Sequence, residues 1–154
     1  FEIYKFQTVR SDLNGLTPEE AFEKIGRPDL IKPYRDGGDY LPDDPRYGSW
    51  SKFLRKTSLD ELPQFWNVLV GDMSVVGPRP PLRREVETYN GDIRRKLLVK
   101  PGVTGLWQIS GRSDLTWDKA VRLDLSYVDN WSMLTDVGII LKTISVVARG
   151  DGAY

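Results

Sequence analysis

Two adjacent carboxylates, Asp60 and Glu61, are the side chains of this sequence whose type and setting best suit chemistry. They follow Arg55 and Lys56, at what the pattern predicts to be the first turn of an amphipathic helix. Ser58 and Glu61 have the spacing of a capping box, and the helix N-terminus favours an ionised carboxylate. An ionised carboxylate can bind Mg²⁺ or attack phosphorus. Helix capping alone also accounts for both residues, so the pattern leaves catalysis and stability open.

Cations for an anionic ligand gather in the middle of the chain. Residues 51–112 carry eleven basic and six acidic side chains, although the whole chain has 22 of each. This local excess predicts an anionic ligand there, and the zero net charge argues against a general nucleic-acid binder. Guanidinium and ammonium groups bind phosphate oxygens, and Arg79, between two prolines, and Arg112, after a glycine, have restricted backbones. For each cation a solvated surface position is the alternative. The candidate phosphate ligands are Lys5, Arg55, Arg79 and Arg112.

Asp124 is a further acidic candidate, either as a metal ligand or supporting acid or as the partner of an arginine in a salt bridge. The remaining basic residues of the middle region are expected to face anionic lipid headgroups or to aid solubility. Those remaining basic residues are Lys52, Arg83, Arg84, Arg94, Arg95 and Lys96.

The chain has no cysteine and no histidine, which excludes disulfides and thiol chemistry and argues against histidine-based zinc sites or acid–base catalysis.

The elements that must position these residues are mostly helical. The pattern predicts a helix-dominated α+β single domain over residues 1–154, with a small β element and long irregular loops. Pro63 is expected to remove one backbone donor and to kink the helix just after the carboxylates. No apolar run is long enough to span a membrane, and because the chain starts at Phe1 in strand-like sequence we expect a fragment of a longer protein. The predicted strands are 1–9 and 106–109, the predicted loop is 27–48, and the predicted helices are 17–25, 49–56, 58–69, 82–89, 92–98, 116–128 and one from 132 onward.

The last predicted helix is apolar around much of its circumference, which indicates burial or an interface. Its apolar positions include Val137, Ile140, Leu141 and Ile144.

The order of the motifs resembles one known family over nearly the whole chain. Each motif is short, but together they are highly specific. They are Lys5-Phe6, Asp44-Pro45-Arg46, Leu54-Arg55-Lys56-Thr57-Ser58-Leu59-Asp60-Glu61-Leu62-Pro63-Gln64, Trp66-Asn67-Val68-Leu69, Gly71-Asp72-Met73-Ser74, Val76-Gly77-Pro78-Arg79-Pro80, Lys100-Pro101-Gly102-Val103-Thr104-Gly105 and Asp151-Gly152-Ala153-Tyr154. The chain resembles the bacterial sugar transferases, the monotopic polyprenyl-phosphate phosphoglycosyl transferases that initiate exopolysaccharide, capsule and O-antigen synthesis.

The resemblance implies transfer of a sugar 1-phosphate from a UDP-sugar to undecaprenyl phosphate, with release of UMP. It implies Asp60 as the nucleophile that forms a covalent phosphosugar intermediate, Glu61 as its catalytic partner, and Mg²⁺ held by this carboxylate pair. Lys5, Arg55, Arg79 and Arg112 match family positions that line the phosphate site, and Asp124 is a weaker acidic match.

The resemblance also implies a place at the cytoplasmic face of the bacterial inner membrane, with the lipid surface as a partner and no nucleic acid. The family carries a membrane-embedded helix before the first predicted strand, and that helix is absent from this sequence. The family commonly has a basic residue where Gln7 stands and Met where Val9 stands. Two other classes of function stay open on the residues alone. These are a nucleotide-sugar or anionic-lipid binding module without turnover, and a structural interaction domain.

Overall fold

Helices dominate the fold, and a single pair of short strands lies among them in the described part of the chain. A computed structural model describes residues 1–37, 41–111 and 115–149. This confirms the predicted helix-dominated α+β class with a small β element. The α-helices are α1 (Pro18–Lys24), α2 (Ile31–Asp36), α3 (Ser49–Lys56), α4 (Gln64–Leu69), α5 (Arg83–Glu87), α6 (Leu106–Ile109), α7 (Trp117–Asp129) and α8 (Met133–Arg149). The strands are β1 (Ser74–Val76) and β2 (Gly102–Thr104), and 3₁₀ helices span Ser11–Leu13, Pro28–Leu30, Leu59–Glu61 and Ile93–Leu98.

The two strands are parallel, and the chain that follows β1 passes very close to β2 and to the residue after it. Ser74 pairs with Gly102 and Val76 with Thr104. A Cβ atom on Gly102 would lie 2.1 Å from the Gly77 nitrogen, and one on Gly105 would lie 2.1 Å from the Gly77 oxygen. Since no side chain fits there, glycine at these positions is what lets the backbones interlock. The interlock fixes where the chain leaves β1 toward Arg79.

The main hydrophobic core joins β1 to the last two long helices. Val76, Tyr127 and Ile139 are buried together. The Tyr127 hydroxyl lies 2.9 Å from Asp136 Oδ1 and 3.2 Å from the Val76 carbonyl oxygen, so one buried group links α7, α8 and β1. Burial and the neighbouring Asp136 charge raise the pKa of Tyr127, which keeps this hydroxyl protonated.

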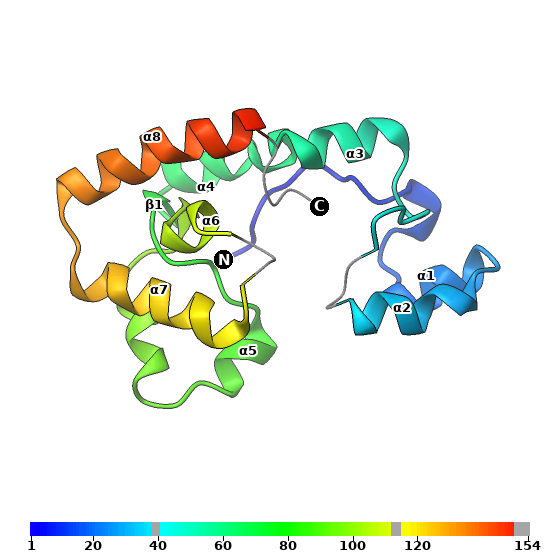
Figure 1. Ribbon diagram of the computed structural model, residues 1–154, viewed down its shortest axis with the longest axis horizontal. Coiled ribbons are helices and arrows are strands. Elements are labelled where there is room, and N and C mark those ends of the chain that lie inside the picture. The colour runs from blue at the N-terminus through cyan, green and yellow to red at the C-terminus, as the bar shows by residue number, and fades with distance from the viewer. Residues whose placement is uncertain (38–40, 112–114, 150–154) are drawn as a thin grey trace.

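Helices α1 and α2 form a small unit at the end of the molecule opposite α7 and α8 (Figure 1). Thr17 and Glu20 make a capping box at the start of α1, inside the helix predicted over 17–25. The Arg46 guanidinium is buried against the rings of Phe22 and Tyr34, at 4.6 and 4.5 Å from their centroids. Its charge is offset by Asp44 at 2.6 Å. The Asp44-Pro45-Arg46 motif therefore supports this unit structurally.

The predicted strand over residues 1–9 is wrong. Its backbone groups bond to a helix and a turn instead of to a sheet, apart from one isolated antiparallel bridge between Val9 and Tyr47. The side-chain amide of Asn67, which is fully buried in α4, accepts the Tyr4 N–H at 3.1 Å and donates to the Glu2 carbonyl at 2.8 Å. The Phe6 N–H donates to the Asp60 carbonyl at 2.9 Å. The first residues thus lie along α4 and reach the Asp60 turn.

Three further predictions of local structure need correction. The predicted loop over 27–48 contains the helix α2. Its Tyr34 is buried, and the composition of this segment did not predict that apolar packing. The predicted strand over 106–109 is α6, because the pairing partner of β1 is 102–104 and Gly105 ends it. The basic helix predicted over 92–98 is a 3₁₀ helix, Ile93–Leu98.

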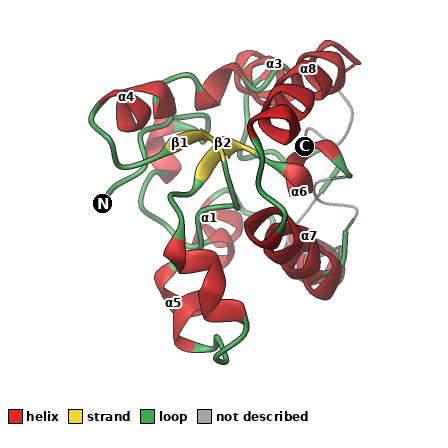
Figure 2. Cartoon of the chain, turned by 90° about the vertical axis from the view of Figure 1, so that its left-hand side faces the viewer, coloured by secondary structure: helices red, strands yellow, loops and turns green. Residues whose placement is uncertain are grey.

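Helices α3, α4 and α8 each carry two or more exposed apolar side chains. Helices α3, α4 and α8 run along the same side of the molecule in both views (Figures 1 and 2). Ile139 is the buried residue of α8 among those described, so of the two predicted alternatives, burial or an interface, burial does not account for most of the apolar face of this helix. The exposed residues are Trp50 and Phe53 on α3, Phe65, Trp66 and Leu69 on α4, and Met133, Leu134, Val137, Ile140, Leu141 and Ile144 on α8.

Among residues 1–37, 41–111 and 115–149, none of the helices combines the length and the apolar character needed to cross a bilayer.

Candidate active site

The two candidate carboxylates lie on a short 3₁₀ helix, Leu59–Glu61, between α3 and α4. Ser58 before it has a left-handed backbone, with φ 54° and ψ 19°, and its N–H donates to the Arg55 carbonyl at 3.0 Å. That geometry ends α3 as a C-terminal cap would. Ser58 also precedes the 3₁₀ helix and its carbonyl accepts the Glu61 N–H at 3.2 Å, but its side chain makes no capping bond to this helix, so the predicted capping box of Ser58 and Glu61 is wrong. Pro63 stands at the N-cap of α4, so the segment predicted as one helix kinked at this proline is divided into a 3₁₀ helix and α4.

The Glu61 carboxylate forms an ion pair with Lys5 instead of capping a helix. Lys5 Nζ lies 2.7 Å from Glu61 Oε1, and both side chains are partly exposed. The first residues of the chain bring Lys5 to this place through their bonds to α4 and to the Asp60 carbonyl. A cation and a carboxylate pair from distant parts of the sequence thus meet at one turn.

Arg55 completes the charge environment of Asp60. Its guanidinium lies 4.4 Å from the Tyr47 ring centroid and donates to the Tyr47 hydroxyl at 3.3 Å, which orients it. Burial raises the pKa of Asp60, the adjacent Glu61 charge raises it further, and Lys5 and Arg55 oppose both effects. The sequence predicted that the helix N-terminus would favour the anion. In the folded chain desolvation and like charge outweigh that effect.

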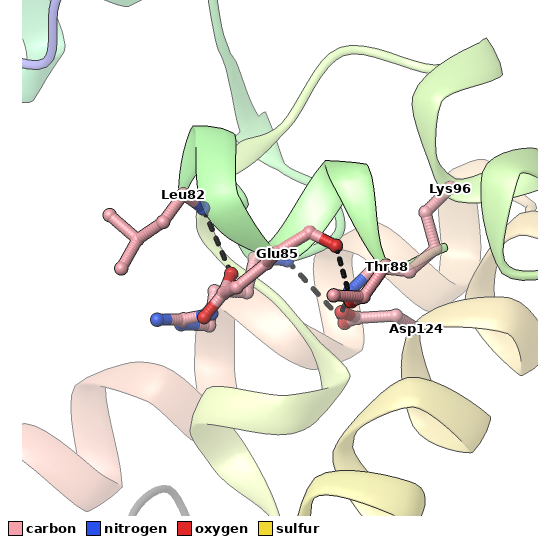
Figure 3. A network of polar contacts seen from close by, with 6 residues as sticks. Leu82, Glu85, Thr88, Lys96 and Asp124 are labelled. Atoms are coloured by element: carbon pink, nitrogen blue, oxygen red, sulfur yellow. Dashed lines mark hydrogen bonds and ion pairs between the residues drawn. The ribbon is translucent and has the colours of Figure 1, made fainter. Parts of the chain in front are cut away.

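Arg79 belongs to a second group of side chains, in the loop between β1 and α5. Arg79 Nη1 donates to the Glu85 carboxylate at 3.0 and 3.2 Å, and the guanidinium carbon lies 5.7 Å from the Trp107 ring centroid. The same carboxylate accepts the Leu82 N–H at 2.8 Å (Figure 3). Glu85 was missed by sequence reasoning, although an acidic residue six positions after a proline-flanked arginine is a usable signal.

Asp124 lies beside this second group and is almost completely buried on α7. Its Oδ2 is 2.6 Å from Lys96 Nζ (Figure 3). Its Oδ1 lies 3.4 Å from the Arg79 backbone nitrogen. Burial raises the pKa of Asp124, and Lys96 and the Arg79 N–H oppose the rise. The prediction of a salt bridge holds in kind, but the partner is a lysine and not an arginine.

The prediction that Lys96 faces lipid or solvent is wrong, since its side chain is only 4% exposed. Its position next to Arg94 and Arg95 made it resemble a surface charge. Two other members of the predicted basic surface form ion pairs of their own, Lys52 with Asp43 at 3.0 Å and Arg95 with Asp129 at 2.5 Å.

The structure therefore brings four of the predicted site residues together and sets two others in a second polar group. Arg112 lies outside the described residues. The roles given to these residues remain predictions. The four are Lys5, Arg55, Asp60 and Glu61, and the two are Arg79 and Asp124.

Among the described residues, the carboxylate pair Asp60 and Glu61 is the candidate cation site. Within the described ranges no group of three or more Asp, Glu, His or Cys side chains could hold a metal ion. Mg²⁺, however, commonly takes one or two protein carboxylates and completes its shell with water and substrate phosphates. The half-buried Asp60, whose pKa is raised in part by Glu61, is the kind of crowded anionic pair that a divalent cation would neutralise. The residues present fit such an ion.

The chain belongs to the bacterial sugar transferase family, whose model matches residues 1–150. This confirms the family that the motifs indicated.

Among its relatives, the UDP-galactose-lipid carrier transferase of Erwinia amylovora is 45% identical over 97% of this chain. The undecaprenyl-phosphate galactose phosphotransferase of Salmonella typhimurium is 46% identical over the whole chain. The exopolysaccharide production protein ExoY of Sinorhizobium fredii is 49% identical, also over the whole chain. The match spans 32%, 32% and 66% of these relatives, respectively.

Proposed function

We propose that this chain is the catalytic part of an enzyme that transfers a sugar 1-phosphate from a UDP-sugar to undecaprenyl phosphate. The observation that carries the proposal is the partly buried Asp60, set beside Glu61 in a turn where Lys5 and Arg55 supply two cations from different segments. The names of the relatives support the substrate classes, since they specify a UDP-sugar, a lipid carrier and a phosphotransferase.

The chemistry has two displacements at one phosphorus atom. An Asp60 carboxylate oxygen attacks the phosphorus that carries the sugar, and the bond from that phosphorus to the UMP oxygen breaks. UMP leaves and a phosphosugar remains on Asp60. An oxygen of undecaprenyl phosphate then attacks the same phosphorus, which breaks the bond to Asp60 and restores the carboxylate.

The neighbouring residues of this chain favour the first displacement. Lys5 and Arg55 supply positive charge where negative charge builds on the phosphoryl oxygens. Partial burial of Asp60 weakens its solvation, so less water must be removed before it attacks. Asp60 and Glu61 would hold Mg²⁺, which when bound supplies Lewis-acid stabilisation of the diphosphate.

We also propose that the side formed by α3, α4 and α8 rests on the membrane at its cytoplasmic face. Its exposed apolar residues include Leu69, 78% exposed, and Leu134, 84% exposed. Apolar patches on this scale mark interaction surfaces. The Asp60 turn directly joins α3 to α4, so the carboxylate lies where this side could deliver a lipid phosphate.

The test is UMP release from a panel of UDP-sugars with Mg²⁺ and undecaprenyl phosphate, using the protein with any native sequence that flanks these residues. We expect release by the native protein and none by Asp60→Asn. The control is Asp43→Asn, which removes an exposed carboxylate. Without lipid acceptor, labelled sugar phosphate should remain bound to the native protein and not to Asp60→Asn. Binding of UDP-sugar with no UMP from any donor would favour a binding module without turnover.

A further inference from the structure

The buried pair of Lys96 and Asp124 is placed directly behind the Arg79 loop. Both side chains are nearly inaccessible, at 4% and 2% exposure, and their charged atoms are 2.6 Å apart. Burying two charges costs desolvation energy, and well-packed apolar residues would often stabilise a fold as well or better. A role in packing alone therefore explains this pair poorly.

Asp124 uses its two oxygens for two different partners. Oδ2 binds Lys96, which comes from the 3₁₀ helix Ile93–Leu98, while Oδ1 lies 3.4 Å from the backbone nitrogen of Arg79. Residues 78, 80 and 81 are prolines, which have no N–H. Arg79 thus carries the one backbone donor of residues 78–81, and Asp124 receives it.

The rest of the loop is fixed on both sides of that bond. Before Arg79, the backbone is locked by the contact of Gly77 with Gly102 and by the Gly102 N–H bond to the Pro78 carbonyl at 3.0 Å. Beyond the backbone, the Arg79 guanidinium is held by Glu85. Asp124 acts at the point between these two restraints.

Lys96 is enclosed so that its charge remains next to Asp124. Its Nζ lies 5.7 Å from the Tyr89 ring centroid and 6.0 Å from that of Trp117, which are cation–π distances. The ammonium therefore favours the ionised form of Asp124, and an ionised carboxylate is the stronger acceptor for a backbone N–H.

We propose that Asp124 is a positioning residue, with Lys96 as its counterion, that fixes the backbone of Arg79 and so presents this guanidinium to a substrate phosphate. The inference rests on the proposed function for the identity of that substrate. The hydrogen-bonding part does not depend on it.

Three double variants separate the effect of the hydrogen-bond acceptor from the effect of the charge. Lys96→Met with Asp124→Asn removes both charges but keeps an oxygen that can accept the Arg79 N–H. Lys96→Met with Asp124→Leu keeps a similar shape and has no acceptor, and Lys96→Met with Asp124→Ala is a second form without an acceptor should the leucine not fit. Asp129→Ala is the matched control, because it removes an exposed pair with Arg95 that joins the same two elements.

The first measurement is hydrogen exchange of the Arg79 amide, followed by NMR of isotope-labelled protein. We expect exchange about tenfold or more faster in the folded variant without an acceptor than in the asparagine variant, as loss of one hydrogen bond implies. Asp129→Ala should leave this amide unchanged. Equal exchange in the variants with and without an acceptor, at equal thermal midpoints, overturns the inference.

The second measurement is kcat/KM for the UDP-sugar. The variant without an acceptor should fall at least about tenfold below the asparagine variant, since misplacement near 1 Å can cost about 10²-fold. If the native protein releases no UMP, the proposed function fails while the exchange comparison still decides the positioning. If exchange changes and kcat/KM does not, Asp124 fixes the loop but the loop does not serve the substrate, which overturns the catalytic half.

Discussion

Replacing Lys5 by methionine separates a role in catalysis from a role in stability. Lys5 and Glu61 form an ion pair whose side chains are 47% and 35% exposed. Pairs this accessible contribute about 0.2–1 kcal/mol, so Lys5→Met should lower the free energy of unfolding by no more than about that amount. As a cation facing the developing phosphoryl charge, the same lysine is expected to affect the rate far more. Loss of one such stabilising group typically costs about 10²–10³-fold in kcat, or about 2.7–4 kcal/mol.

The assay pairs denaturant unfolding with UMP release on the same preparations. Lys52→Met is the matched control, since it removes an exposed lysine paired with Asp43 one helix away from the carboxylates. We expect both variants to lose similar small amounts of stability and Lys5→Met alone to lose activity. An activity loss in Lys5→Met no larger than that of Lys52→Met would refute the idea that Lys5 acts on the substrate.

Three further predictions concern pH, packing and the lipid-facing side. The pKa of Asp60 is raised on folding, so the folded state binds this proton more tightly and stability falls as pH rises from the unfolded value through the folded one. Asp60→Asn should accordingly gain thermal stability relative to the native protein as pH rises through that window, and an equal difference at all pH values would contradict this. Gly102→Ala should unfold the chain or destabilise it by more than the about 1–3 kcal/mol of ordinary overpacking, because its Cβ would meet the Gly77 backbone at 2.1 Å. Gly91→Ala, with nothing within 4 Å, should be nearly neutral in the same denaturation experiment. Leu69→Asp and Leu134→Asp should each reduce co-flotation with anionic phospholipid vesicles while the melting temperature stays unchanged, and unaltered flotation would argue against this side as the lipid contact.

Sequence patterns predicted the parts of the fold that depend on local interactions. The helices predicted over 17–25, 49–56 and 116–128, which correspond to α1, α3 and α7, follow from spacing within one segment. The prediction of a strand over the first nine residues failed, because a composition rich in β-forming residues does not identify a pairing partner. The Tyr4 N–H instead donates to the side-chain amide of Asn67, 63 residues away. The prediction of a capping box at Ser58 failed for a related reason. Its backbone conformation is set by how α3 ends, and the capping-box spacing is compatible with either outcome.

The candidate site was predicted in the same uneven way. The adjacent carboxylates and the proline-flanked Arg79 stand out in the sequence, because unusual neighbours mark them. Lys96 does not stand out in the sequence, because it lies in a run of basic residues. Only the residues that pack over it in the folded chain distinguish it, as a buried counterion, from a surface lysine. Whether two distant charges meet depends on tertiary contacts that no single segment encodes.

The attachment of the first residues to Asn67 has a consequence for the order in which the site forms. Lys5 and Glu61 are 56 positions apart, and the segment that carries Lys5 adds little to the buried core. Docking of this segment closes a long loop of chain and so costs conformational entropy. The hydrogen bonds of the Asn67 side-chain amide and a few other bonds must offset that cost. Such a segment can detach by local opening at a smaller free energy than global unfolding. The protein can then remain folded with its carboxylate pair intact and one cation displaced, so the population of the competent site and the stability of the fold are separate quantities.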